Sequence, residues 1–294
     1  MAVMERKENV DAIGAVMLTS FAALLAFNQV VIKISSGGFG PVYMAGLRSV
    51  GAVVVILLWM RLRRISIATA PQARLGGVLV GVLFAVEFMA IYSAIDITTV
   101  SRASIMLYTM PVWLALIGHF VLPGERLTTR RSLGLALAMI GVVMALVDRS
   151  GADVSLLGDL LGLFAAICWA GIALTVRLTP LSEEKPEVQL FWQLAISAPV
   201  LMIAALLIGD TMRDLAPIHL WGLVFQIFCV ASFGFLWWFW LLKRYPASGV
   251  ASFSFLSPVL AVFFGWWILD ETITWGTWLA LVLVALGLVL INRK

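Results

Sequence analysis

Apolar stretches of about 20 residues alternate with short polar clusters along the whole chain. A helix of about this length crosses roughly 30 Å of hydrocarbon, and a spanning segment must satisfy its backbone hydrogen bonds internally. The pattern therefore predicts an all-α membrane protein with ten transmembrane helices. The predicted spans are residues 12–34, 41–60, 74–95, 100–122, 131–147, 157–177, 188–208, 219–242, 246–269 and 274–291.

Composition supports this interpretation. Hydrophobic residues make up 62% of the chain and charged residues only 12%, whereas soluble domains have about 45–50% and about 25%. The connections between the predicted spans are mostly short, so no soluble domain is expected. The first span is too long for a removable signal peptide and lacks the small-residue cleavage pattern of one.

Basic residues are concentrated on one side of the predicted spans. If the N-terminus is cytoplasmic, 15 of the 20 Lys and Arg residues lie in inner segments and four in outer ones. This bias predicts a multi-pass protein of the plasma membrane, in bacteria the inner membrane, with both termini cytoplasmic. The basic residues are scattered over short loops without a recognition module, so nucleic acid is not an expected partner.

The second half of the chain repeats the first. Pro111 pairs with Pro258 and Gly118 with Gly265, both 147 residues apart. One residue is then lost, and the pairing continues at a separation of 146 residues. The later pairs are Glu125 with Glu271 and Gly141 with Gly287. A half-length repeat built of membrane spans is typical of secondary transporters.

The repeat divides the chain into residues 1–149 and 150–294, each with five predicted spans. Because five is odd, the second copy is expected to cross the membrane in the opposite orientation. The substrate site of such a repeat lies near the midplane between the halves. Pro111 and Pro258 occupy matching places in the fourth and ninth spans. They are interpreted either as simple kinks or, given the symmetry, as paired structural hinges.

A small-residue span with a central proline, followed by the turn Leu122-x-x-Glu-x-Leu-Thr128, resembles the drug/metabolite transporter superfamily. The whole chain is similar to its ten-helix EamA-type exporters, which include aromatic amino-acid exporters. The resemblance implies monomeric or weakly associating carriers of metabolites or amino acids with a central cavity. One departure concerns the Trp-Gly pair of the first span. The second copy has Trp169-Ala170-Gly171, but the first has Leu25-Ala26-Phe27.

Polar residues inside the apolar spans are the candidate substrate-binding residues. Arg48 and Glu87 both lie roughly 10–12 Å below the outer boundary. An intramembrane charge costs about 2.5–3.5 kcal/mol or more, so it usually faces a cavity or a partner. Two interpretations are open. Either the two charges form a structural pair, or Arg48 or Lys33 meets a substrate carboxylate while Glu87 meets an amine or carries a proton. Asn28, Gln29 and Tyr108 complete this layer.

The second repeat has no equivalent charged layer, since Gln193 falls near the position of Arg48 and Gly234 near that of Glu87. Its notable residues are aromatic. Trp169, Trp237 and Trp238 lie deep enough in their spans to line a cavity for an apolar substrate, although helix packing is the alternative role for each.

Other chemistry has little support in the sequence. Cys168 and Cys229 lie mid-span, so free thiols without a disulfide or a metal are expected. No Walker motif is present, and no cofactor is expected. Glu125 and Glu271 stand just before the next predicted helices, where a carboxylate is expected to cap the helix that follows.

The preferred hypothesis is a secondary exporter of small metabolites that works by alternating access, with aromatic or large apolar amino acids as the predicted cargo. An antiporter of phosphorylated sugars or nucleotide sugars is the alternative within transport, but it would require several inward-facing Lys or Arg residues. A lipid-modifying intramembrane enzyme is the alternative from another class. It would require a nucleophile with its base, or a metal cluster, at the midplane, and no catalytic residue is predicted.

Overall fold

The computed structural model describes residues 10–122, 127–150, 154–245, 253 and 255–292. Their regular structure is helical apart from one isolated bridge between Phe39 and Met212. The predicted all-α class is therefore confirmed for this part of the chain. The helices are α1 Ala12–Ser35, α2 Pro41–Leu62, α3 Pro71–Ile97, α4 Val100–Leu107, α5 Met110–Val121, α6 Thr129–Val147, α7 Leu156–Leu178, η1 Pro180–Glu183, α8 Pro186–Ile208, α9 Pro217–Phe225, η2 Gln226–Gly234, α10 Phe235–Arg244, α12 Leu256–Leu269 and α13 Trp275–Asn292.

Eight segments are long and apolar enough to cross a membrane, with α4 and α5 taken as one segment. They coincide with the first eight predicted spans to within a few residues. The shorter α12 and α13 lie in the last two predicted spans, and much of residues 246–255 falls outside the described part. Large apolar side chains such as Leu207 and Trp275 point outward, as expected where lipid surrounds a bundle. The chain is a multi-pass membrane protein.

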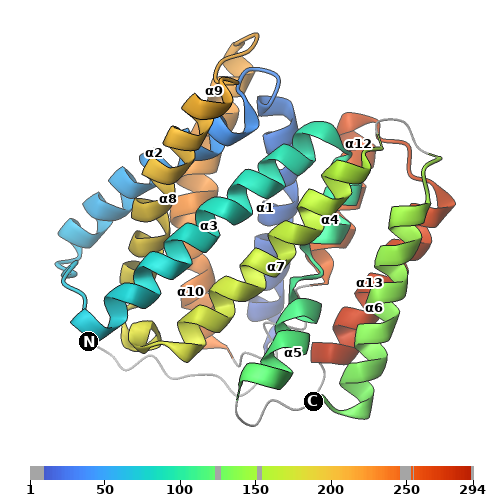
Figure 1. The fold of residues 1–294 in the computed structure, drawn as a ribbon, viewed down its shortest axis with the longest axis horizontal. Coiled ribbons are helices and arrows are strands. Elements are labelled where there is room, and N and C mark those ends of the chain that lie inside the picture. Colours follow the sequence, from blue (N-terminus) through green and yellow to red (C-terminus); the bar gives the residue numbers. More distant parts are fainter. Residues whose placement is uncertain (1–9, 123–126, 151–153, 246–252, 254, 293–294) are drawn as a thin grey trace.

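The helices run between two faces of the bundle (Figure 1). We call the face at which α1 begins and α13 ends the terminal face, and the other the opposite face. At the opposite face Lys33, near the end of α1, donates from Nζ to the carbonyl oxygens of Ile95 at 2.8 Å and Thr98 at 3.0 Å. Thr98 Oγ1 in turn lies 3.4 Å from a carboxylate oxygen of Asp159, in the first turn of α7. The start of α7 therefore lies where α1 and α3 end.

Both repeated prolines stand in the first turn of a helix. The fourth predicted span is divided, because α4 ends at Leu107 and α5 begins at Met110. Pro111 is the second residue of α5, where the missing N–H of proline costs no helical hydrogen bond. Pro258 is the third residue of α12. The fourth span is therefore one membrane segment, Val100–Val121, that is interrupted just before Pro111.

The eighth predicted span changes its helical type partway. The π-helix η2 separates α9 from α10, and Ser232 Oγ donates to the carbonyl oxygen of Ile227 at 2.8 Å within it. Gln226, at its start, is fully buried and accepts a hydrogen bond from Tyr92 Oη at 2.6 Å. A π-helix is rare and often marks a functional segment. Here the hydrogen bond between Tyr92 and Gln226 connects α3 of the first half to η2 of the second half.

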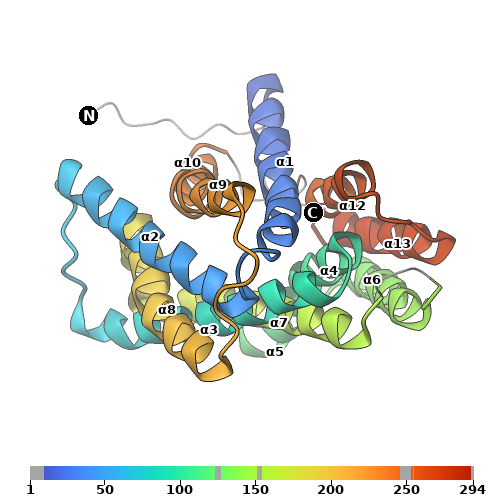
Figure 2. The ribbon, with the colours of Figure 1, turned by 90° about the horizontal axis from the view of Figure 1, so that it is seen from above.

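Two helix pairs close the ends of the bundle: α2 packs against α8, and α6 against α13 (Figure 2). Glycine allows α6 and α13 to approach closely. A Cβ atom on Gly134 would lie 2.7 Å from the carbonyl oxygen of Gly287, and one on Gly141 would lie 2.9 Å from that of Ala280. Small residues at such crossings are typical of membrane helices. The two contacts are also reciprocal, because adding 146 to Gly134 and Gly141 gives Ala280 and Gly287.

The prediction that Glu271 caps the helix after it was wrong, because Glu271 contacts a different helix. Glu271 does not cap α13, the helix that follows it. Its carboxylate accepts hydrogen bonds from the N–H groups of Val100 at 2.5 Å and Ser101 at 3.0 Å, in the first turn of α4. The sequence could not reveal this partner 170 residues away. A Cβ atom on Gly265 would lie 2.5 Å from the Glu271 carboxylate, so this repeated glycine makes room for the cap. The matching Glu125 lies outside the described residues.

A buried ion cluster joins α4 to the start of α7. Asp159 is fully buried, and Arg102 donates to its two carboxylate oxygens from Nε at 3.1 Å and Nη2 at 2.7 Å. Arg149 Nη1 donates to the same carboxylate at 2.8 Å. Arg102 also donates to the carbonyl oxygens of Ala145 and Asp148, which end α6. This cluster, Lys33 and Glu271 connect helix ends on the opposite face.

Candidate functional site

A cavity of about 430 Å³ lies inside the bundle. Both halves of the chain contribute to its wall. The first half contributes α1, α2, α3, α4 and α5, and the second contributes α7, α8, η2, α10 and α12. The lining reaches Arg177, the penultimate residue of α7 at the terminal face. Pockets of 300–1,000 Å³ with mostly apolar walls and a few polar groups are typical of small-molecule sites.

Arg48 brings a buried positive charge to this cavity. The residue is 1% exposed, and its Nε and Nη1 atoms have no hydrogen-bond partner in the structure. The guanidinium carbon lies 4.1 Å from the centre of the Phe88 ring, a cation–π distance. Arginine N–H groups that are buried without an acceptor are costly. Their geometry suits a planar carboxylate, which a guanidinium can bind through two hydrogen bonds.

Glu87 lines the same cavity and is 6% exposed. The hypothesis of a structural Arg48–Glu87 pair is not confirmed, because no oxygen of Glu87 lies within ion-pair distance of Arg48. The two opposite charges therefore share a cavity without neutralising each other through direct contact. Such an arrangement can hold a molecule that carries both a negative and a positive group.

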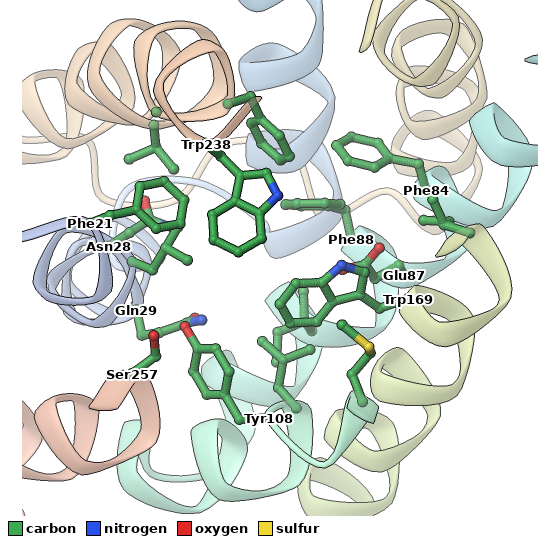
Figure 3. Close-up of a pocket in the computed structure, with 18 of the residues that line it drawn as sticks. Phe21, Asn28, Gln29, Phe84, Glu87, Phe88, Tyr108, Trp169, Trp238 and Ser257 are labelled. Atoms are coloured by element: carbon green, nitrogen blue, oxygen red, sulfur yellow. The ribbon is translucent and has the colours of Figure 1, made fainter. Parts of the chain in front are cut away.

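The predicted polar layer is brought together. Asn28 and Gln29 of α1 are buried and line the cavity, and their side-chain oxygens Oδ1 and Oε1 have no hydrogen-bond partner. Tyr108, at the break between α4 and α5, also lines it. In Figure 3 the side chains of Gln29, Tyr108 and Ser257 point toward one another. The layer therefore holds acceptor oxygens that are free to bind an ammonium group.

Aromatic and aliphatic side chains together form the remaining wall, and several of the rings meet one another (Figure 3). The rings of Tyr108 and Trp169 meet edge to face with centroids 6.1 Å apart, and those of Phe84 and Phe88 lie 4.4 Å apart. The Trp238 ring is stacked on Phe21 at 5.1 Å. This surface can accommodate a flat apolar group by ring contacts worth about 0.5–1.5 kcal/mol each beyond area burial.

Two candidate residues are placed elsewhere. Trp237 does not line the cavity; it packs on Phe21 with ring centroids 5.8 Å apart, while its neighbour Trp238 faces the cavity. Lys33 is engaged by the carbonyl oxygens at the end of α3 and is not part of the lining. Pro111 lines the cavity. Cys168 and Cys229 are free thiols, as predicted.

Several lining residues were not predicted from the sequence. Phe84, Phe88 and Ile91 lie on α3 near Glu87, and Phe21 and Ser257 come from α1 and α12. A helical wheel through Glu87 would have found Phe84 and Ile91, which are three and four residues away on the same side of the helix. Phe88 follows Phe84 by four residues and lies beside it. Phe21 and Ser257 carried no comparable signal, because they depend on how distant helices pack.

A helical membrane bundle with a cavity between two related halves, lined by a few buried polar groups, is typical of a multi-pass transporter. The chain matches the EamA-like transporter family over residues 12–147 and again over residues 156–293, and it belongs to that family. The family is part of the drug/metabolite transporter superfamily, so the resemblance seen in the sequence is confirmed.

Relatives match nearly the full length of the chain. An "Uncharacterized transporter YoaV" of Bacillus subtilis is 25% identical, covering 92% of this chain and 94% of its own. A "Probable amino-acid metabolite efflux pump" of Escherichia coli is 28% identical, covering 97% and 94%. A crystal structure with 20% identity has a TM-score of 0.65, covering 93% of this chain and 94% of its own, which shows the shared fold.

Proposed function

We propose that this transporter is a secondary exporter of amino acids with aromatic or large apolar side chains. The observation that carries the proposal is the buried Arg48, whose Nε and Nη1 lack an acceptor inside a mostly apolar cavity that contains several aromatic rings. A carboxylate supplies the missing acceptor, and the rings accept an apolar body. The relative whose name describes amino-acid metabolite efflux is in keeping with this cargo.

Each part of an amino acid finds a complementary group. Arg48 binds the α-carboxylate through bidentate hydrogen bonds. Glu87 and the side-chain oxygens of Asn28 and Gln29 receive the ammonium group. Trp169, with Tyr108 beside it, contacts the apolar side chain. Phosphorylated sugars fit less well, because the described lining contains two basic residues, Arg48 of α2 and Arg177 near the end of α7.

Transport is proposed to proceed by alternating access between two inverted repeats, residues 1–149 and 150–294, that together make ten spans. The start of α7 at the face where α1 ends supports the inversion, as do the reciprocal contacts between α6 and α13. Pro111 and Pro258, each in the first turn of a helix, are the proposed hinges. No ATP is needed, because a carrier requires only a difference in substrate affinity between its two states.

Both termini are proposed to be cytoplasmic in the bacterial inner membrane, since the basic residues favour that side. We therefore expect a cysteine introduced at Ser66, which is exposed at the terminal face, to react with an impermeant maleimide only after intact cells are permeabilised. Cys168 and Cys229 are first replaced by serine. The control is a cysteine at exposed Asp214 on the opposite face, which should react in intact cells. Labelling of Ser66→Cys from outside would reverse the proposed orientation.

The cargo assignment predicts the behaviour of purified protein in liposomes. We expect flux of L-phenylalanine and L-leucine down their gradients without ATP. Trp169→Ala should reduce phenylalanine flux about fivefold relative to leucine flux, because a lost ring contact is worth about 1 kcal/mol. The control Trp267→Ala removes an exposed ring outside the cavity and should leave this ratio unchanged. Flux confined to phosphorylated compounds would contradict the amino-acid cargo.

A further inference from the structure

We propose that the Glu87 carboxylate binds a proton and the substrate ammonium group in turn, which makes the protein a proton-coupled amino-acid antiporter. The inference rests on the proposed function and adds a second transported species, the proton, to the same site. It also predicts that each turnover moves net charge across the membrane. Intramembrane carboxylates that face a cavity commonly serve as proton carriers in transporters.

The position of Glu87 in the span supports this proposal. Glu87 lies well inside its span, ten residues before the end of α3, and is 6% exposed. Among the described residues that line the cavity, it is the one carboxylate. An ionised carboxylate at this depth is stable only with a cation beside it. A bound ammonium group or a bound proton both remove that cost, and they compete because they need the same oxygens.

The separation between Glu87 and Arg48 also supports this proposal. A closed ion pair would neutralise both charges and leave neither for a ligand. Here the guanidinium stacks on Phe88 and keeps two N–H-bearing atoms without acceptors, while the Glu87 oxygens lie beyond ion-pair distance. The site therefore has one place for an anion and a separate place for a cation.

No other described group facing Glu87 is suited to the same exchange. Helix α2 contributes Arg48, and α3 itself contributes Tyr92, whose hydroxyl donates to Gln226. Helix α7 contributes the Cys168 thiol, and Tyr108 stands at the break before α5. Thiols and phenols lose their protons at higher pH than carboxylic acids. From α1 and α8 the facing polar residues are the amides Asn28, Gln29 and Gln193, which do not titrate.

Each turnover exchanges one proton for one amino acid at Glu87. When a zwitterionic amino acid enters from the cytoplasm, its ammonium group takes the place of the Glu87 proton, and the O–H bond breaks as that proton passes to cavity water. The loaded site, with Arg48 positive, Glu87 negative and a neutral substrate, carries no net charge. At the outer side a proton binds Glu87 and releases the amino acid. The return state carries one positive charge, so one proton enters for each amino acid exported.

The test uses the full chain in liposomes with L-phenylalanine as the probe. We expect a pH gradient, and separately a membrane potential set with potassium and valinomycin, to drive phenylalanine against its gradient with one charge moved per molecule. Glu87→Gln should lose this accumulation at least tenfold. Cys168→Ser, which alters the neighbouring titratable group and leaves the carboxylate in place, should accumulate as the native protein does.

A second measurement needs no transport. Infrared spectra of the substrate-free protein should contain a protonated-carboxyl band that disappears in Glu87→Gln and, in the native protein, on addition of phenylalanine. If phenylalanine is neither bound nor moved but the band depends on Glu87, the cargo fails and the proton site stands. Phenylalanine flux in the native protein with no charge moved would overturn the proposal, whether or not Glu87→Gln folds. Accumulation retained by Glu87→Gln would also overturn it.

Discussion

Replacing Arg48 with methionine should stabilise the protein and abolish its binding of amino acids. Arg48 is buried, and two of its nitrogen atoms have no acceptor, so it destabilises the substrate-free fold. Replacing a buried ion pair by apolar side chains of similar volume is often neutral or stabilising by about 1–4 kcal/mol, and Arg48 has no ion-pair partner among the described residues that its removal would leave uncompensated. The expected result is a higher melting temperature in detergent for Arg48→Met. The rise in melting temperature that phenylalanine gives the native protein should be lost.

Arg102→Met is the matched control. Arg102 is also almost completely buried, at 3% exposed, but it is bonded to Asp159 and to the carbonyl oxygens at the end of α6. Its removal should lower the melting temperature. If Arg48→Met destabilises the protein as Arg102→Met does, Arg48 is a structural residue and its proposed role as the substrate anchor is wrong.

Asp159→Asn should be strongly destabilising. The native carboxylate accepts from two arginines, and Arg102 is buried beside it. Breaking a buried ion pair by removing one partner costs about 3–5 kcal/mol, because the remaining charge is left uncompensated. The free energy of unfolding, measured in detergent with a chemical denaturant, should fall by about this amount.

The double variant Asp159→Asn with Arg102→Met tests the cause. It removes the buried charge together with its partner and should recover part of the lost stability. A double variant that is as unstable as the sum of the two single variants would mean that the residues act independently. Arg149, whose side chain is 34% exposed, can turn to water and should add little to the effect.

Apolar run length located the spans well, because lipid imposes the same requirement on every residue of a crossing helix. It could not locate the break between α4 and α5, since Tyr108 and Thr109 are as compatible with a helix as their neighbours. The depth of Asn28, Gln29, Arg48 and Glu87 correctly placed them around one cavity. Depth carried no information on the distance between Arg48 and Glu87, which depends on side-chain direction.

Trp237 was predicted from its depth in the span, and depth does not determine the direction in which a side chain points. The adjacent Trp238 reaches the cavity instead. Partners such as Glu271 for α4 and Asp159 for Arg102 were hidden for another reason: they join segments 57 to 171 residues apart.

The reciprocal crossing of α6 and α13 bears on how the chain arose. Gly134 against Gly287, and Ala280 against Gly141, are the two contacts that a pair of identical half-length chains would make across a twofold axis. In such an ancestor one codon would have specified both members of an equivalent pair, and a bulky replacement would have obstructed both crossings at once. After duplication and fusion each copy could diverge alone, which is how alanine can stand at position 280 while glycine is kept at position 134.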